Sequence, residues 1–315
     1  MKALIIGGAG FVGGYLADHL HNQCKWSVSV TKMPHETISV DETIQVYDLN
    51  ILDIDSVITL LNQLRPDYIF HLAAQSSVAL SWKNPNLTID VNIKGSIHVL
   101  DAIRSVEHYD PRILLIGSGE EYGHIQPDET PIAEKNVLRP GNIYAATKAC
   151  QNMIGKIYSD AYHMNIISVR AFNHIGPKQN PMFVLPDFCK QVAEIEAGLR
   201  EPIIYVGNLS AKRDFTDVRD VVNAYALLMK HGQRGETYNV GSGHAIAIQD
   251  ILDMILEHST ANISVKTDPQ KLRPVDVPII EADVQKLKDC TGWEPKYSIK
   301  DTIFDVLDEW RELPK

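Results

Sequence analysis

The sequence contains little cysteine, and its few cysteines are scattered. Cys24, Cys150, Cys189 and Cys290 form neither a Cys-x-x-Cys pair nor a cluster with histidine. Structural zinc sites and disulfide frameworks depend on such spacings. We therefore expect reduced thiols and no metal site.

Basic clusters and long apolar runs are also missing. The 30 lysines and arginines are outnumbered by 40 aspartates and glutamates, for a formal net charge of −10 at pH 7. Nucleic-acid binding needs concentrated positive charge, so no nucleic-acid partner is expected. No uncharged run approaches the roughly 18 apolar residues that cross a bilayer, and the opening MKALIIGGAGFVGG has no signal-cleavage pattern. We expect a cytoplasmic protein without membrane association.

What the sequence does have is a regular alternation of short apolar runs and longer amphipathic ones. The apolar runs are ALIIGG, WSVSV, IQVYD, DYIFHLA, RILLIG and NIISVRAF, and helical patterns such as 54–64, 86–105 and 145–162 separate them. Near-continuous apolar strands between helices predict an α/β fold with a Rossmann-like, doubly wound parallel sheet.

After about residue 172, proline and glycine interrupt this rhythm. We therefore predict a smaller α/β C-terminal lobe that holds the substrate. Residues 1–171, with a returning segment near 214–240, are assigned to an NAD(P)-binding domain, and residues 172–213 and 241–315 to the lobe.

A glycine-rich turn lies between the first predicted strand and the first predicted helix. Gly7, Gly10 and Gly13 surround Phe11 and Val12 in a G-x-x-G-x-x-G spacing. Glycines there allow the backbone to approach a pyrophosphate, and the helix N-terminus favours its negative charge. The strand before and the helix after make this context typical of dinucleotide binding.

The choice of dinucleotide depends on the end of the second strand. NAD-binding folds usually carry an acid there for the ribose 2′-hydroxyl, but this chain has Thr31 and Lys32. A lysine suits a 2′-phosphate, so we predict NADP(H), with NAD(H) as the alternative. Further candidates are the adenine-side residues Asp48 and Leu49 and the phosphate-side residues Leu72, Ala73, Ala74 and Gln75.

The segment IYAATKA places Tyr144 and Lys148 four residues apart, on one face of a helix. A free tyrosine has a pKa of about 10, too high for easy proton exchange at neutral pH. We expect the lysine ammonium to favour the phenolate and so poise Tyr144 for proton transfer.

With the glycine turn and with Ser118 at the end of a strand, this pair resembles the Ser–Tyr–Lys set of the extended short-chain dehydrogenase/reductases. The motifs GGAGFVG, HLAA, VNIKG, YxxxK, RDFTDVRD and YNVGSG follow that family's order along nearly the whole chain. The resemblance implies that Ser118 and Tyr144 bind a reacting sugar oxygen and that Asn92 orders the central helix. Asn92 and Phe172 join the predicted cofactor residues.

Longer stretches are similar to nucleotide-sugar enzymes, above all GDP-4-keto-6-deoxy-D-mannose reductases and then GDP-mannose 4,6-dehydratases. These stretches are VALSWKNPNLTIDVNIKG, RAFNHIGPKQ, AKRDFTDVRD and RPVDVP. The resemblance implies a substrate site that contains Ser81, Glu120, Asn173, His174, Arg213, Arg273 and Asp276. A guanidinium suits a diphosphate because it pairs with phosphate in a forked geometry.

The stretch GSGEEYG separates the possible reactions. Dehydratases of this kind need a base and a proton donor, and carry a hydroxyl or acid between the catalytic serine or threonine and the glutamate. Here Gly119 occupies that position, while Glu120 stands where the dehydratase base stands. We therefore predict a reductase that makes GDP-D-rhamnose, with Glu120 and Glu121 binding sugar hydroxyls or lying in a solvated loop.

Other activities stay open at this point. The alternatives are a GDP-mannose 4,6-dehydratase that uses Glu120 in catalysis, a nucleotide-sugar 4-epimerase, and a non-catalytic dinucleotide-binding relative. The resemblance also implies a homodimer formed through the helices of 86–105 and 145–162.

Overall fold

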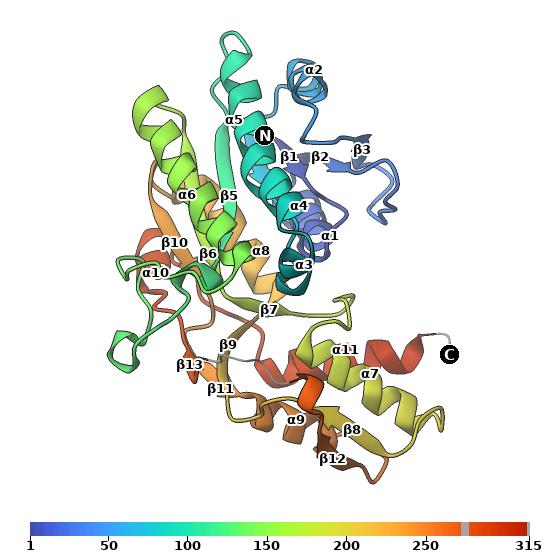
Figure 1. Cartoon of the computed structure of the whole chain (residues 1–315). Helices are drawn as coiled ribbons and strands as arrows, with labels where there is room; N and C mark the ends of the chain where they lie inside the picture. Colours follow the sequence, from blue (N-terminus) through green and yellow to red (C-terminus); the bar gives the residue numbers. More distant parts are fainter. Residues whose placement is uncertain (272–276, 314–315) are drawn as a thin grey trace.

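Seven parallel strands form the main sheet of the computed structural model, which describes residues 1–271 and 277–313. The strand order is β10-β6-β5-β4-β1-β2-β3, and all neighbouring pairs are parallel. The strands are β1 (Lys2–Ile6), β2 (Ser27–Lys32), β3 (Gln45–Asp48), β4 (Tyr68–His71), β5 (Arg112–Ser118), β6 (Ile166–Ala171) and β10 (Thr237–Val240). The predicted α/β fold is confirmed, and Figure 1 shows this sheet in the half that holds the N-terminus.

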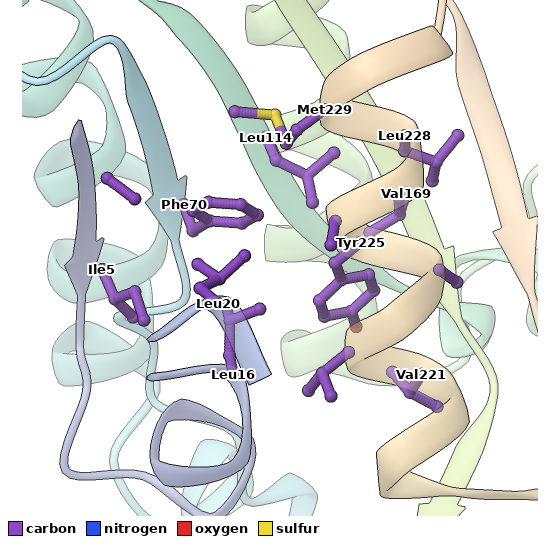
Figure 2. Packing of buried hydrophobic residues seen from close by; sticks show 14 of the residues in the cluster. Ile5, Leu16, Leu20, Phe70, Leu114, Val169, Val221, Tyr225, Leu228 and Met229 are labelled. Carbon is purple, nitrogen blue, oxygen red and sulfur yellow. The ribbon is translucent and has the colours of Figure 1, made fainter. Parts of the chain in front are cut away.

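Helices cover both faces of the sheet because its strands are apolar on both sides. One face carries α1 (Phe11–Asp18), the π-turn η1 (His19–Gln23) and α8 (Val218–His231), and the other carries α2 (Ile54–Leu64), α5 (Gly95–Ser105) and α6 (Ile143–Tyr162). Figure 2 shows the first core, where Leu16 and Leu20 share a cluster with Phe70 and with Tyr225 of α8.

The smaller lobe is built around β9. A four-stranded sheet combines β7 (Asn173–Ile175), β9 (Lys212–Asp217), β11 (Ala245–Ala247) and β13 (Ile279–Ile280), and a second, parallel pair combines β8 (Ile203–Val206) and β12 (Ser264–Thr267). The helices α7 (Val184–Glu196), α9 (Ile248–Glu257) and α11 (Ile299–Glu312) enclose a core of their own that includes Phe188, Leu252 and Leu307. Figure 1 shows this lobe beside the C-terminus.

Two features differ from the sequence-based prediction. The helix α10 (Gln285–Thr291) packs against α8 and β10, and Leu287 and Trp293 join the main-sheet core although they fall in the range predicted for the lobe. The helical run expected over 86–105 is divided into α4 (Pro85–Ile89), the π-turn η2 (Asp90–Lys94) and α5. Asn92 lies in that turn with its side chain buried.

Short helices complete the chain between these elements. They are α3 (Val78–Lys83), η3 (Gly119–Tyr122), η4 (Pro127–Glu129) and η5 (Pro269–Lys271). Among the described residues, no helix is long and apolar enough to cross a membrane. The same residues contain no group of three or more His, Cys, Asp or Glu side chains that could hold a metal ion.

Candidate active site

A cavity of about 1080 Å³ lies between the main sheet and the lobe. Its lining comes from the glycine turn after β1, from the carboxyl ends of strands β2 to β6, and from α7 and β9 of the lobe. In open parallel sheets this edge is where ligands bind, because the loops there are free to differ from one protein to another.

Most of the residues predicted from the sequence line this one cavity. On the cofactor side they are Gly7, Gly10, Phe11, Val12, Gly13, Thr31, Lys32, Leu49, Leu72, Ala73, Ala74 and Phe172. Ser118, Glu120, Tyr144, Lys148, Asn173, His174 and Arg213 line it as well. Arg273 and Asp276 lie outside the described residues.

The glycine turn has the shape that a pyrophosphate requires. A Cβ atom on Gly7, whose φ is +91°, would lie 2.6 Å from the backbone of Ala73, and one on Gly13 would overlap Gly8. Gly10 is different: it caps α1 and lines the cavity, and a Cβ there would meet no protein atom closer than 3.7 Å. Protein packing therefore does not explain this glycine, whereas close approach of a phosphate to the helix N-terminus does.

An ion pair lies beside the cavity at the ends of β2 and β3. Lys32 Nζ lies 2.5 Å from Asp48 Oδ1, and Lys32 lines the cavity while Asp48 does not. Asp48 thus contacts Lys32, and its contact with adenine stays a prediction. Glu36 also lines the cavity and accepts a hydrogen bond from the Met33 amide at 2.8 Å. Sequence reasoning missed this acid because it lies beyond the strand end, in a loop.

Tyr144 and Lys148 share one face of α6, as the spacing predicts, but burial governs their protonation. Burial lowers the pKa of Lys148 to about 8, and its Nζ donates to the Ile116 carbonyl at 2.7 Å and to Gln151 Oε1 at 3.2 Å. Burial raises the pKa of Tyr144 to about 12; hydrogen bonding to Ser118 lowers it, and the carboxylate of Glu120 raises it. The expected net acidification of the phenol is not seen, because burial is the largest influence on the Tyr144 pKa and raises it.

Ser118 and Glu120 meet at the turn from β5 into η3. The Ser118 hydroxyl accepts a hydrogen bond from the Glu120 amide at 3.2 Å. Glu120 Oε2 accepts one from Asn142 Nδ2 at 3.1 Å, and Asn142 Oδ1 in turn caps α6 by accepting from the Ala145 amide at 2.8 Å. The N-cap of the helix that carries Tyr144 therefore also fixes Glu120 at the cavity wall.

The second glutamate of the pair has a different role from its neighbour. Glu121 is fully buried. Its carboxylate accepts hydrogen bonds from the Ser118 amide at 2.8 Å, from Asn152 at 2.8 Å and from Arg170 Nε at 3.0 Å. The prediction of a sugar contact or a solvated loop is wrong for this residue, which closes the capping box of η3 and ties it to β6.

Besides Asp48, three predicted residues do not line the cavity. Ser81 is buried, and its hydroxyl donates to the Val78 carbonyl at 2.7 Å, so it is not placed to bind substrate. Asn92 Oδ1 accepts from the Gln75 amide at 2.8 Å, and its Nδ2 donates to Thr147 Oγ1 at 2.9 Å. Asn92 therefore joins the loop after β4 to α6, and both it and Gln75 support the wall of the cavity from behind.

Gly119 faces the ring of Phe172. A Cβ atom at this position would lie 3.2 Å from the ring, so a side chain there would require the ring to shift. On the substrate side, Asn173 and His174 line the cavity at β7, and the His174 ring stacks on Phe11 with centroids 6.0 Å apart. Arg213 of β9 donates to the Val277 carbonyl at 2.7 Å.

Several residues that line the cavity were not predicted from the sequence. They include Asn50, Ile51 and Leu52 after β3, Met182, Phe183 and Asp187 around the start of α7, and Asn208, Lys271 and Tyr225 elsewhere. For the first group the sequence offered one signal: these residues closely follow Asp48, which ends a predicted strand. The others follow from how the lobe and α8 pack against the sheet, which no local pattern records.

Comparison with known proteins gives consistent results. The family model for GDP-mannose 4,6 dehydratase matches residues 4–306. A GDP-6-deoxy-D-mannose reductase of Pseudomonas aeruginosa is 30% identical over 310 residues, covering 98% of this chain and 97% of the relative. The solved structure of RMD from Pseudomonas aeruginosa complexed with NADPH has a TM-score of 0.88 at 28% identity, with 99% of each chain covered.

A third relative is named as an epimerase. A UDP-glucose 4-epimerase of Thermus thermophilus, solved in complex with NAD, has a TM-score of 0.87 at 27% identity, with 99% of each chain covered. Reductases, dehydratases and epimerases thus share this architecture. Since the family model spans almost the whole chain, the protein belongs to the GDP-mannose 4,6-dehydratase family of extended short-chain dehydrogenase/reductases.

Proposed function

We propose that the protein reduces the C4 keto group of GDP-4-keto-6-deoxy-D-mannose with NADPH and gives GDP-D-rhamnose, NADH being the alternative cofactor. The name of the Pseudomonas aeruginosa reductase supports the reaction, and the NADPH in the related solved structure supports the cofactor. The cavity supports both, because a cradle for a dinucleotide and a Ser–Tyr–Lys set line the same space.

The observation that carries the choice of reduction over dehydration is the contact between Gly119 and Phe172. Water elimination needs a base and a separate proton donor near the sugar. Glu120 could serve as the base, but the neighbouring position that would hold a second polar group has no side chain and is covered by the ring of Phe172. A single hydride transfer needs only the groups that are present.

The protonation of Tyr144 suits this direction of reaction. When bound, the dihydronicotinamide supplies a hydride to the C4 carbon. Tyr144, whose pKa is raised to about 12, carries the proton that the carbonyl oxygen then takes, which completes the alcohol. Ser118 can donate to the same oxygen, and the positive charge of Lys148 favours the phenolate that remains. Donors aimed at a developing oxyanion are typically worth about 10²-fold or more in rate.

One assay separates this reaction from its rivals. The protein is incubated with NADPH and the 4-keto sugar nucleotide, and separately with GDP-mannose and no reduced cofactor. Stoichiometric loss of NADPH absorbance in the first mixture supports the reductase, and the coupling constants of the product ring identify the C4 epimer. A 4-keto product from GDP-mannose in the second mixture would instead establish the dehydratase.

The dehydratase is the second candidate because Glu120 lines the cavity and is held there by Asn142. An epimerase is tested in the same preparation. It would interconvert the two C4 hydroxyl epimers of a nucleotide sugar without net consumption of NADPH.

We further infer a homodimer. Four apolar side chains on two neighbouring helices are exposed: Leu87 and Ile89 on α4 and Met153 and Ile157 on α6. These four residues are called the α4–α6 patch below. Clustered exposed apolar side chains indicate an association surface.

A further inference from the structure

Tyr225 is a buried tyrosine that the reaction outlined above does not use. It lies midway along α8, and its side chain is fully buried in the cluster on one face of the main sheet. Its hydroxyl has no hydrogen-bond partner among the described residues. An unpaired buried hydroxyl destabilises a fold, so each such group in a native protein calls for an explanation, such as a bound water or ligand.

The hydroxyl is directed toward the cavity. The connection 232–236 joins the end of α8 to the start of β10, so α8 begins at the carboxyl edge of the strands, where the cavity lies. Side chains on a helix lean toward its N-terminus. Figure 2 shows the oxygen of Tyr225 on the side of its ring that faces Val221, one turn closer to that N-terminus. Consistently, Tyr225 lines the cavity.

Tyr225 lines the same cavity as Ser118 and Tyr144. Burial raises the pKa of its hydroxyl well above the usual range. Tyr225 therefore keeps its proton and can act only as a neutral donor or acceptor. The lining of this cavity also includes the apolar residues Ile116, Ala171 and Phe172.

We propose that the Tyr225 hydroxyl donates a hydrogen bond to the carboxamide oxygen of a bound nicotinamide and thereby fixes the rotation of the ring. This inference rests on the proposed function, which requires the ring to stand beside Ser118 and Tyr144. The carboxamide is the only polar substituent of that ring, and the Tyr225 hydroxyl, which has no partner among the described residues, belongs to a side chain that lines the same cavity. Fixing the rotation selects which face of the ring meets the sugar.

The test compares two ligands that differ by the nicotinamide. Dissociation constants of NADP⁺ and of 2′-phospho-ADP-ribose, which lacks the nicotinamide, are measured by calorimetry for the wild type and for Tyr225→Phe. Loss of one neutral hydrogen bond should weaken NADP⁺ binding roughly three- to tenfold, while 2′-phospho-ADP-ribose binding should stay unchanged. Tyr109→Phe is the control, because it removes a half-buried hydroxyl that donates to the Pro66 carbonyl, and Tyr109 does not line the cavity.

The other possible results of this experiment lead to different conclusions. Equal weakening of both ligands, or no weakening of either, would overturn the role of Tyr225. A wild type that binds neither ligand would overturn the proposed function, and this inference with it. Should Tyr225→Phe fail to fold, thionicotinamide-NADP⁺ provides the same contrast in the wild type, since sulfur is a weaker acceptor than oxygen; equal affinity for the two dinucleotides would then count against the proposal.

Discussion

At the scale of single residues, burial moves the protonation of Tyr144 and Lys148 in opposite directions. The pKa of Lys148 falls to about 8, because burial disfavours its charged form. The pKa of Tyr144 rises to about 12 for the same reason. At neutral pH the lysine therefore keeps its charge and the phenol keeps its proton, which is the state that a carbonyl reduction requires.

This difference predicts an alkaline limit to activity. As pH rises through about 8, Lys148 loses its proton before Tyr144 does, so the positive charge that favours the phenolate disappears. We expect kcat/KM for the 4-keto substrate to fall above about pH 8, by up to about tenfold per pH unit. In Lys148→Met the rate should be low and this decline should be absent. An unchanged decline in that variant would assign the titration to another group.

The ion pair between Lys32 and Asp48 predicts how the protein distinguishes the two dinucleotides. A 2′-phosphate at Lys32 has to share its ammonium with the Asp48 carboxylate 2.5 Å away. Asp48→Asn removes the competing charge and should increase NADPH affinity relative to NADH about fivefold, since one partly solvated charge contact is worth about 1 kcal/mol. Lys32→Met should shift the ratio the other way. The measurement is the pair of dissociation constants; a ratio that stays constant in both variants would place the 2′-position elsewhere.

At the scale of elements, the corner between β5 and η3 is held by a buried ion pair. Arg170 of β6 and Glu121 of η3 are both largely buried, and Asn152 of α6 shares the carboxylate. The buried Glu121 carboxylate of η3 is therefore bound by side chains of both β6 and α6, next to Ser118. Removal of a single partner leaves the other charge buried without compensation, which typically costs about 3–5 kcal/mol.

Arg170→Met should therefore lower the free energy of unfolding by about 3 kcal/mol or more, because the Glu121 carboxylate keeps its burial and loses its cation. Urea denaturation measures this change. Lys156→Met, which breaks the exposed pair with Asp160, is the control and should leave the midpoint near that of the wild type. Similar midpoints for all three proteins would show that Asn152 and the Ser118 amide suffice to hold the carboxylate.

The elements also show what sequence patterns can predict. The bounds of α2 follow the apolar periodicity and end at the predicted residues, because this helix buries one continuous stripe. The π-turn η2 was not predicted, since periodicity does not report a backbone that lets Asn92 reach both Gln75 and Thr147. Motifs predicted the residues that line the cavity near the strand ends.

At the scale of the whole molecule, the cavity depends on the packing of the lobe against the main sheet. Residues contributed by the lobe, such as Asp187 and Lys271, form an ion pair across more than eighty positions of sequence. Tyr225 similarly reaches the cavity from a helix whose pattern indicates only core packing. Contacts of this kind have no local signature, which explains why sequence reasoning missed these residues.

The exposed α4–α6 patch leads to a prediction about assembly. Met153 and Ile157 are 61% and 58% exposed, one helical turn apart on the helix that also carries Tyr144. If two copies associate through this patch by a two-fold axis, each side chain is repeated across the interface. Ile157→Glu then places like charges close together, and sedimentation should show the 35.2 kDa monomer instead of a species of twice that mass. Val137→Glu, at a 60% exposed apolar residue outside the patch, should leave the dimer intact. A dimer that persists in Ile157→Glu would place the contact on another face, and a wild type that sediments as a monomer would contradict the dimer itself.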